Sequence, residues 1–262
     1  MKLTVDGRTV FATTGGTDFD PAKPAIVFLH GAGFDRTAWR LQTRWFAHHG
    51  RSVLAVDFPA HGWSDGPALT SIAAMADWTG RLIEAAGLRQ AALVGHSMGA
   101  LVALDCAGRH PDKVRALGLC GVAVEMPVHP EMLESAKANT SKVQELMTFW
   151  GMGNALHKGG MVSPGLWLRR ESLAVLAVNR PDVIHTDLAA CNAYKDAPAR
   201  AAAVKCPTVL VLGDGDLMTP APKGKPLAAA IAGSKTVVIP NCGHFMMVER
   251  PDETLEALKS CV

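Results

Sequence analysis

Short, almost continuously apolar runs alternate along this chain with longer segments that have the apolar spacing of amphipathic helices. After the N-terminal region the runs are Ala25–Leu29, Ser52–Val56, Ala91–Val94, Ala116–Leu119, Thr208–Leu212 and Thr236–Ile239. Strands that are apolar on both faces need cover on both faces, and parallel strands joined by helices receive it. The alternation therefore predicts an α/β fold with a mostly parallel central sheet flanked by helices.

The remaining elements follow from turn and helix-end residues. Leu3–Asp6 and Thr9–Thr13 flank Gly7 and predict a hairpin that opens the chain. The expected helices are Thr37–His49, Ser71–Ala86, Met98–Arg109, Pro226–Ala232 and Asp252–Leu258.

Residues 124–194 interrupt the alternation, because they contain helical patterns divided by proline and glycine but no clear strand. We expect them to form a helical cap, inserted after the sixth strand, over the carboxyl edge of the sheet. Residues 1–123 and 195–262 would then form the core. The alternative is that the interval simply continues the main core.

Composition excludes several classes of protein. The chain has 262 residues and a net charge of +2, with no basic run longer than Arg169-Arg170, so neither nucleic acid nor a membrane surface is an expected partner. The N-terminus does not resemble a signal peptide, and no apolar run approaches the roughly 18 residues of a membrane span. Six scattered cysteines without a CxxC pair are expected to be reduced thiols. We expect a cytoplasmic protein.

The most informative motif is Gly95-His96-Ser97-Met98-Gly99, which lies between an apolar strand and a good helix. A serine on a sharp strand-to-helix turn needs small residues two positions before and after it, because larger side chains would collide there. Such a turn exposes the hydroxyl and directs the helix N-terminus towards any anion that forms beside it. Ser97 is therefore the predicted nucleophile.

A serine nucleophile needs a base to accept its proton and a carboxylate to orient that base. His244, just after the last strand, is the predicted base, whereas we expect His96 to point away and pack. The other histidines on helices and loops, His48, His49, His110, His129, His157 and His185, are expected to face solvent. Asp214, Asp216 and Glu125 all follow strands and are candidates for the acid. The order Ser97, Asp216, His244 matches that of one hydrolase architecture.

Three further motifs carry a family resemblance. They are Phe28-Leu29-His30-Gly31-Ala32-Gly33, Asp57-Phe58-Pro59-Ala60-His61-Gly62-Trp63-Ser64, and Gly243-His244-Phe245 leading to Glu249-Arg250-Pro251. With the serine motif, they make the chain resemble the α/β-hydrolase superfamily, in its capped single-domain esterase/lactonase branch. Ala60 departs from the usual glycine.

The resemblance assigns roles to individual residues. It implies that Asp216, four positions before Pro220, is the acid, and that the backbone N–H groups of Ala32 and Met98 form an oxyanion hole. His30 and His61 would brace their loops.

Together these residues predict a carboxylesterase that cleaves esters of small to medium acyl chain through an acyl-serine intermediate. No metal or cofactor is expected, because the sequence has neither the ligand spacing of a metal site nor a dinucleotide-binding motif. The expected partner is a small-molecule ester or lactone, and both monomer and homodimer remain open. The candidate pocket residues are Phe34, Trp150, Trp167, Met218 and Phe245.

Other functions would use the same three residues. Within the fold they are an enol-lactonase, a C–C bond hydrolase and a cofactor-free perhydrolase. Outside catalysis, a small-molecule receptor of the same fold is the alternative.

Overall fold

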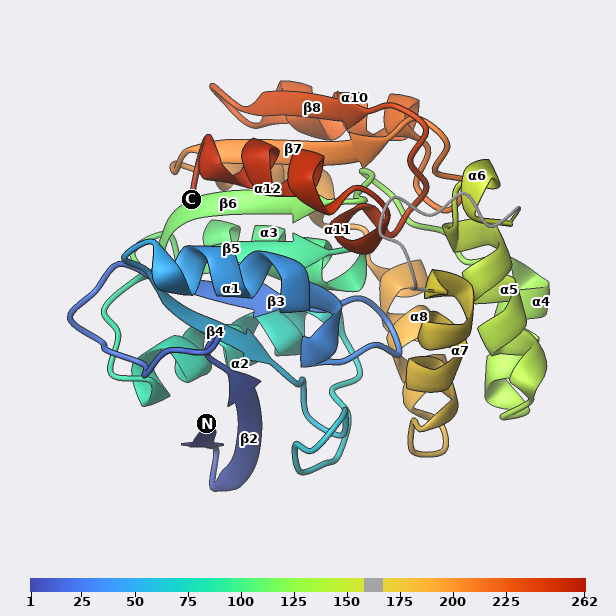
Figure 1. Ribbon diagram of the computed structural model, residues 1–262, viewed down its shortest axis with the longest axis horizontal. Coiled ribbons are helices and arrows are strands. Elements are labelled where there is room, and N and C mark those ends of the chain that lie inside the picture. Colours follow the sequence, from blue (N-terminus) through green and yellow to red (C-terminus); the bar gives the residue numbers. More distant parts are fainter. Residues whose placement is uncertain (158–166) are drawn as a thin grey trace.

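A single sheet organises the computed structural model, which describes residues 1–157 and 167–262. In this part of the chain eight strands run in the order β1-β2-β4-β3-β5-β6-β7-β8 (Figure 1). The strands are β1 (Lys2–Val5), β2 (Arg8–Thr13), β3 (Ala25–Leu29), β4 (Ser52–Val56), β5 (Ala91–His96), β6 (Val114–Cys120), β7 (Thr208–Gly213) and β8 (Lys235–Ile239). The predicted α/β fold class is confirmed.

The pairing explains why the central strands are apolar on both faces. β1 and β2 form the predicted hairpin, and β2 joins β4 antiparallel, whereas every pair from β4 to β8 is parallel. In the middle of the sheet Val27 lies between Leu54 and Leu93. All residues of β3, β4, β5 and β7 are buried. Parallel strands share one carboxyl edge, so the loops that follow them are brought together there.

Helices cover both faces of the sheet, with α1 and α12 on one side and α2, α3 and α10 on the other (Figure 1). The core helices are α1 (Arg40–His48), α2 (Ile72–Ala85), α3 (Met98–Arg109), α9 (Ala197–Ala203), α10 (Ala221–Ala230), α11 (Met246–Glu249) and α12 (Pro251–Lys259). A 3-10 turn, Arg36–Trp39, precedes α1.

One core helix is misplaced in the sequence prediction. The helix expected at Pro226–Ala232 is α10, which spans Ala221–Ala230 and begins five residues earlier. Proline is favoured in the first turn of a helix, and Pro222 occupies that position. Pro226 lies inside the helix, one turn later, although the sequence pattern predicts that the helix begins there.

Between β6 and β7 the chain forms a helical insertion beyond the carboxyl edge of the sheet (Figure 1). Its helices are α4 (Pro130–Lys137), α5 (Ser141–Gly151), α6 (Asn154–His157), α7 (Leu168–Ala177) and α8 (Val183–Ala193). Residues 158–166, which include part of the expected cap, lie outside the described residues. Among the helices that are described, none has the length and hydropathy of a membrane span.

A buried carboxylate joins the end of the insertion to the core. Asp105 of α3 is fully buried and accepts hydrogen bonds from the Tyr194 hydroxyl at 2.7 Å and from Arg200 Nε at 3.0 Å. Arg109 Nε donates to its other oxygen. Three charged or polar donors therefore depend on one side chain that water does not reach.

Replacing Asp105 with asparagine keeps the volume of the side chain but removes its charge. We expect Asp105→Asn to lower the free energy of unfolding by about 2–3 kcal/mol, because the buried acceptor loses charge-assisted bonds. Asp196 lies 3.9 Å from the same Arg200, and its side chain is 58% exposed. The control Asp196→Asn is expected to cost less than about 1 kcal/mol. Urea denaturation measures both, and equal losses would contradict this view of the cluster.

Candidate active site

The turn between β5 and α3 is forced by close backbone contacts. A Cβ atom on Gly95 would lie 2.1 Å from the Gly99 carbonyl oxygen, and one on Gly99 would lie 2.4 Å from the Leu29 carbonyl oxygen. Neither position accepts any other residue without movement of the backbone. Ser97, between them, has φ 54° and ψ −115°, which costs on the order of 1–3 kcal/mol for a residue with a side chain.

The strained turn places Ser97 at the start of α3, at the wall of a cavity. Its backbone carbonyl accepts the first hydrogen bonds of α3, from Ala100 and Leu101. The residue is 8% exposed and lines a cavity at the carboxyl edge of the sheet. The hydroxyl is therefore placed at the N-terminus of a helix, beside an open volume.

His244 lies on the loop after β8 and is oriented by Asp216. The distance from His244 Nδ1 to Asp216 Oδ2 is 2.8 Å. Because the carboxylate accepts, Nδ1 carries the proton, and the lone pair is left on Nε2. Within the described chain, Nε2 is buried and has no hydrogen-bond partner. His244 also lines the cavity that Ser97 lines, so its free ring nitrogen is available as a base there.

The surroundings of Asp216 keep it ionised. Its Oδ1 accepts from the backbone N–H groups of Met218 and Thr219, both at 2.8 Å, and the Thr219 hydroxyl donates to Oδ2 at 2.7 Å. Burial alone would raise the pKa of Asp216, but the His244 charge and these hydrogen bonds outweigh it and lower the pKa to about 2.

The other two candidate acids lie elsewhere. Asp214 is exposed and accepts from the backbone N–H of Cys242 at 3.2 Å. Glu125 is exposed and lies 3.6 Å from Lys195. The geometry thus brings only Asp216, of the three, to His244.

A second buried carboxylate shapes the loop that carries His244. Glu249 accepts from the backbone N–H groups of Gly243 at 2.9 Å and Phe245 at 3.0 Å, on either side of the histidine. It also accepts from Gly153 N–H, at the end of α5, at 3.0 Å. Burial raises the pKa of Glu249, although these three donors act in the opposite direction. The insertion and the histidine loop are therefore held by the same side chain.

His96 takes part in the wall of the cavity, which corrects the expectation that it points away. Its Nε2 donates to the carbonyl oxygen of His244 at 2.9 Å, and the two rings are 4.7 Å apart. Burial and the nearby His244 hold the pKa of His96 well below its ordinary value. His96 is a neutral support for the histidine loop.

The Ala32 amide is oriented by the peptide to which it belongs. His30 Nε2 accepts from Phe58 N–H at 3.1 Å, so its Nδ1 carries the proton and donates to the Gly31 carbonyl at 2.8 Å. Phe34 N–H donates to the same carbonyl at 3.1 Å. In a trans peptide the N–H lies opposite the carbonyl, so both bonds direct Ala32 N–H to the other side.

The backbone N–H groups of Ala32 and Met98 are available to an anion. Neither has an acceptor among the residues that the structure describes. Gly31 and Ala32 line the cavity together with Ser97, and Met98 directly follows Ser97. These are the two N–H groups that the family resemblance assigns to an oxyanion hole.

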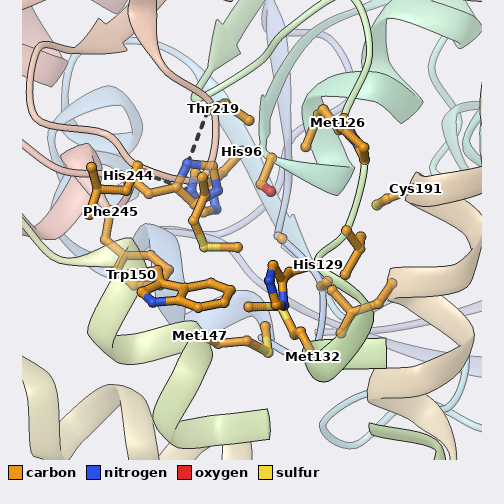
Figure 2. A pocket seen from close by; sticks show the side chains of 18 of the residues that line it. His96, Met126, His129, Met132, Met147, Trp150, Cys191, Thr219, His244 and Phe245 are labelled. Carbon is orange, nitrogen blue, oxygen red and sulfur yellow. Dashed lines mark hydrogen bonds between the residues drawn. The ribbon is translucent and has the colours of Figure 1, made fainter. Parts of the chain in front are cut away.

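The cavity has a volume of about 360 Å³ and lies between the sheet edge and the insertion. In Figure 2, Trp150, His129, Met132 and Met147 lie across it from His96 and Thr219. Of the five expected pocket residues, the four that line it are Phe34, Trp150, Met218 and Phe245.

Trp167 does not line the cavity. It precedes α7 and is 63% exposed. The size of Trp167 makes it a candidate in the sequence, but the direction of its side chain depends on how α7 packs. Its neighbour Leu168 points inward and is buried.

The cavity wall also contains Met126, Met132 and Met147, which the sequence does not single out, because a methionine looks the same in a core and in a pocket wall. The sequence predicts that His129 faces solvent. His129 is exposed, yet it lines the cavity and its ring lies 5.1 Å from that of Trp150.

No group of three histidine, cysteine or acidic side chains is arranged to hold a metal ion in the described ranges, 1–157 and 167–262.

Known proteins resemble this chain over most of its length. The model of a family described as the alpha/beta hydrolase family matches residues 26–257. RutD of Klebsiella variicola, which bears the provisional name of a carbamate hydrolase, is 30% identical over 251 residues, 88% of each chain. A pimeloyl-[acyl-carrier protein] methyl ester esterase of Chromobacterium violaceum is 30% identical over 90% of this chain and 92% of its own.

Among solved structures, the enol-lactonase from Burkholderia xenovorans LB400 superposes with a TM-score of 0.88. It covers 99% of this chain and 98% of its own, at 21% identity. At that identity the likeness is one of fold.

The contacts of Asp216 generate a test of the acid. In Asp216→Asn the amide oxygen can still accept from Met218 and Thr219, which turns the NH₂ group towards His244 Nδ1. The imidazole would then hold its proton on Nε2 and could not accept one from serine. We expect kcat for ester hydrolysis to fall by about 10⁴-fold.

Asp214→Asn is the matched control, because its amide oxygen can still accept from Cys242, and we expect near wild-type kcat. Glu125→Gln serves the same purpose at the exposed ion pair. A dead Asp214→Asn or Glu125→Gln variant would contradict the assignment of Asp216.

Proposed function

The chain belongs to the alpha/beta hydrolase family, and we propose that it is a serine hydrolase of carboxylic esters with small to medium acyl chains. The observation that carries this proposal is the convergence of Ser97 and the free Nε2 of an Asp216-oriented His244 on one cavity. Its relatives at 30% identity bear the names of hydrolases that act on carbonyl compounds.

In the first step Ser97 Oγ attacks the ester carbonyl while His244 Nε2 takes the hydroxyl proton. Asp216, ionised at neutral pH because its pKa is about 2, stabilises the imidazolium that forms. The carbonyl oxygen becomes an anion that the N–H groups of Ala32 and Met98 stabilise. Each such donor is typically worth about 10²–10³ in rate.

The intermediate then collapses. The bond to the leaving alcohol breaks, and the alcohol oxygen takes the proton from His244 Nε2, which leaves the acyl group on Ser97. Water attacks the acyl-serine with His244 again as base, and the acid departs as Ser97 recovers its proton. Ester and lactone carbonyls follow the same steps, so p-nitrophenyl esters and lactones are assayed side by side.

We propose that the helical insertion, residues 124–194, acts as a cap that contacts the acyl group. The reacting carbonyl is common to all esters, so discrimination depends on the groups around it. Trp150, Met132 and Met147 of α4 and α5 present apolar surface to the cavity. Methionine side chains adapt their shape, so selectivity among acyl chains should be graded rather than sharp.

The nucleophile is tested by substitution and by labelling. Ser97→Ala should retain the fold and lose essentially all ester hydrolysis, because His244 and Asp216 then have no hydroxyl to activate. A sulfonyl fluoride should transfer its sulfonyl group to the Ser97 oxygen with loss of fluoride, which raises the mass of the peptide that contains Ser97 in the wild-type protein. Undiminished activity in the alanine variant, or a label on a different residue, would end the serine-hydrolase assignment.

The acyl-binding role of the insertion is tested with two tryptophans. Trp150→Ala removes bulk from the cavity wall and should move the optimal p-nitrophenyl ester to a longer acyl chain. The preference should change by about tenfold in relative kcat/KM, the size expected for a change of one methylene. Trp167→Ala is the control, because Trp167 is exposed and outside the cavity. The cap proposal fails if Trp150→Ala keeps the wild-type chain-length profile.

A further inference from the structure

Two side chains of the helical insertion form hydrogen bonds with Gly33, in the loop that carries Ala32. Gly33 N–H donates to Asp187 Oδ2 of α8 at 2.8 Å. Its carbonyl accepts from Asn179 Nδ2, between α7 and α8, at 2.6 Å. Both polar groups of Gly33 are thus bound by side chains that lie more than 140 residues away in the sequence.

Two helices of the insertion pack closely against Gly33. The residue has φ +68°, and a Cβ atom there would lie 2.9 Å from Leu176 Cδ2 and 3.0 Å from Ile184 Cγ1. These neighbours belong to α7 and α8. The left-handed backbone and the approach of the two helices both favour glycine at this position.

Asp187 is itself fixed by a buried partner. It is fully buried, and its Oδ2 lies 2.8 Å from His61 Nε2. The other ring nitrogen, Nδ1, faces the Pro59 carbonyl at 3.1 Å. Both nitrogens therefore face acceptors, which is the arrangement of a protonated imidazole.

The charges around this pair are consistent with that reading. Burial lowers the pKa of His61, but the Asp187 carboxylate outweighs burial and the net pKa is raised. His30, whose ring lies 4.8 Å from that of His61, has its pKa lowered to about 4 by burial and by His61. One charged and one neutral histidine thus stand side by side.

We propose that Asp187, which is paired with His61 and assisted by Asn179, is a positioning residue for the oxyanion hole. The insertion would then contribute to the chemical step as well as to acyl binding. This inference rests on the proposed function, since it assigns a task to the loop only if an anion forms beside Ala32.

The path from Asp187 to the reacting carbonyl is short. Gly33 N–H belongs to the peptide that directly follows the one carrying Ala32 N–H. On the inner side, His30 and Phe34 fix the Ala32 amide through the Gly31 carbonyl. On the outer side, Gly33 N–H donates to Asp187, its only acceptor among the residues that the structure describes. His61 balances the carboxylate charge, which would otherwise oppose an anion at the same loop.

Two independent variants disturb the outer side. Asp187→Asn removes the charge that favours a protonated His61. A neutral His61 that donates from Nδ1 to Pro59 presents a lone pair at Nε2. The amide atom in the place of Oδ2 would then have to donate to His61 and accept from Gly33 N–H, and it cannot do both.

Asn179→Ala removes the donor to the Gly33 carbonyl at a half-buried position and keeps the proposal testable if the first variant folds poorly. Tyr194→Phe is the control, because it removes a buried hydrogen bond between the end of the insertion and Asp105 of α3.

The readout separates chemistry from stability. For each variant, kcat and KM are measured on the preferred p-nitrophenyl ester. Inhibition constants are measured for a trifluoromethyl ketone, which forms an oxyanion with the active serine, and for the matching methyl ketone. Thermal denaturation is followed in parallel.

We expect Asp187→Asn and Asn179→Ala to lower kcat by about tenfold or more, with KM changed less than about threefold. The inhibition constant of the trifluoromethyl ketone should rise with the loss in kcat/KM, while that of the methyl ketone stays constant. Tyr194→Phe should lower the denaturation temperature and leave kcat at the wild-type value.

Wild-type kcat and inhibition constants in both Asp187→Asn and Asn179→Ala would overturn the proposal. So would a loss of kcat that Tyr194→Phe reproduces at equal loss of stability. Failure of the proposed function looks different: the wild-type protein itself would hydrolyse no ester or lactone and would bind the trifluoromethyl ketone no better than Ser97→Ala does.

Discussion

The backbone of β5 approaches the first turn of α3, and that turn approaches the end of β3, so closely that side chains are excluded at Gly95 and Gly99. A Cβ at Gly95 would lie 2.1 Å from the Gly99 carbonyl oxygen. This contact forces Ser97 into a left-handed conformation, which the packed sheet around it can sustain. The hydroxyl consequently leaves the core at the carboxyl edge, where the loops after β3, β7 and β8 converge. The other site residues are arranged around a position that the backbone has already fixed.

The helical insertion supports this site on two sides. Towards the histidine, the Gly151 carbonyl accepts from His244 N–H at 2.6 Å, and Glu249 accepts from the N–H groups of Gly153, in the insertion, and Gly243, beside the histidine. Towards the loop after β3, which carries Ala32, Asp187 accepts from Gly33 N–H at 2.8 Å. The segment that lines the cavity is therefore bonded to both of the loops that carry proposed site residues, His244 and Ala32. Under the proposed mechanism, a substitution in the insertion changes turnover without touching the substrate.

Sequence predicted what depends on neighbours along the chain and failed where direction depends on distant packing. The turn at Ser97 is encoded within five residues, so the motif was sufficient to find it. Asp214 and Asp216 share one strand end, and only the fold of the whole loop turns the second towards His244; the family resemblance, rather than the spacing, distinguished them. Trp167 and Asp187 lie in the insertion, where packing between helices turned the first to solvent and buried the second without any local signal.

In the proposed mechanism, Ser97 carries the acyl group between two steps. Butyrate esters with p-nitrophenyl, phenyl and 2-naphthyl leaving groups are turned over in water containing methanol, and the ratio of methyl butyrate to butyric acid is measured. A common acyl-serine partitions between methanol and water independently of the group that has left, so we expect one ratio for all three esters. A ratio that changes with the leaving group would contradict it.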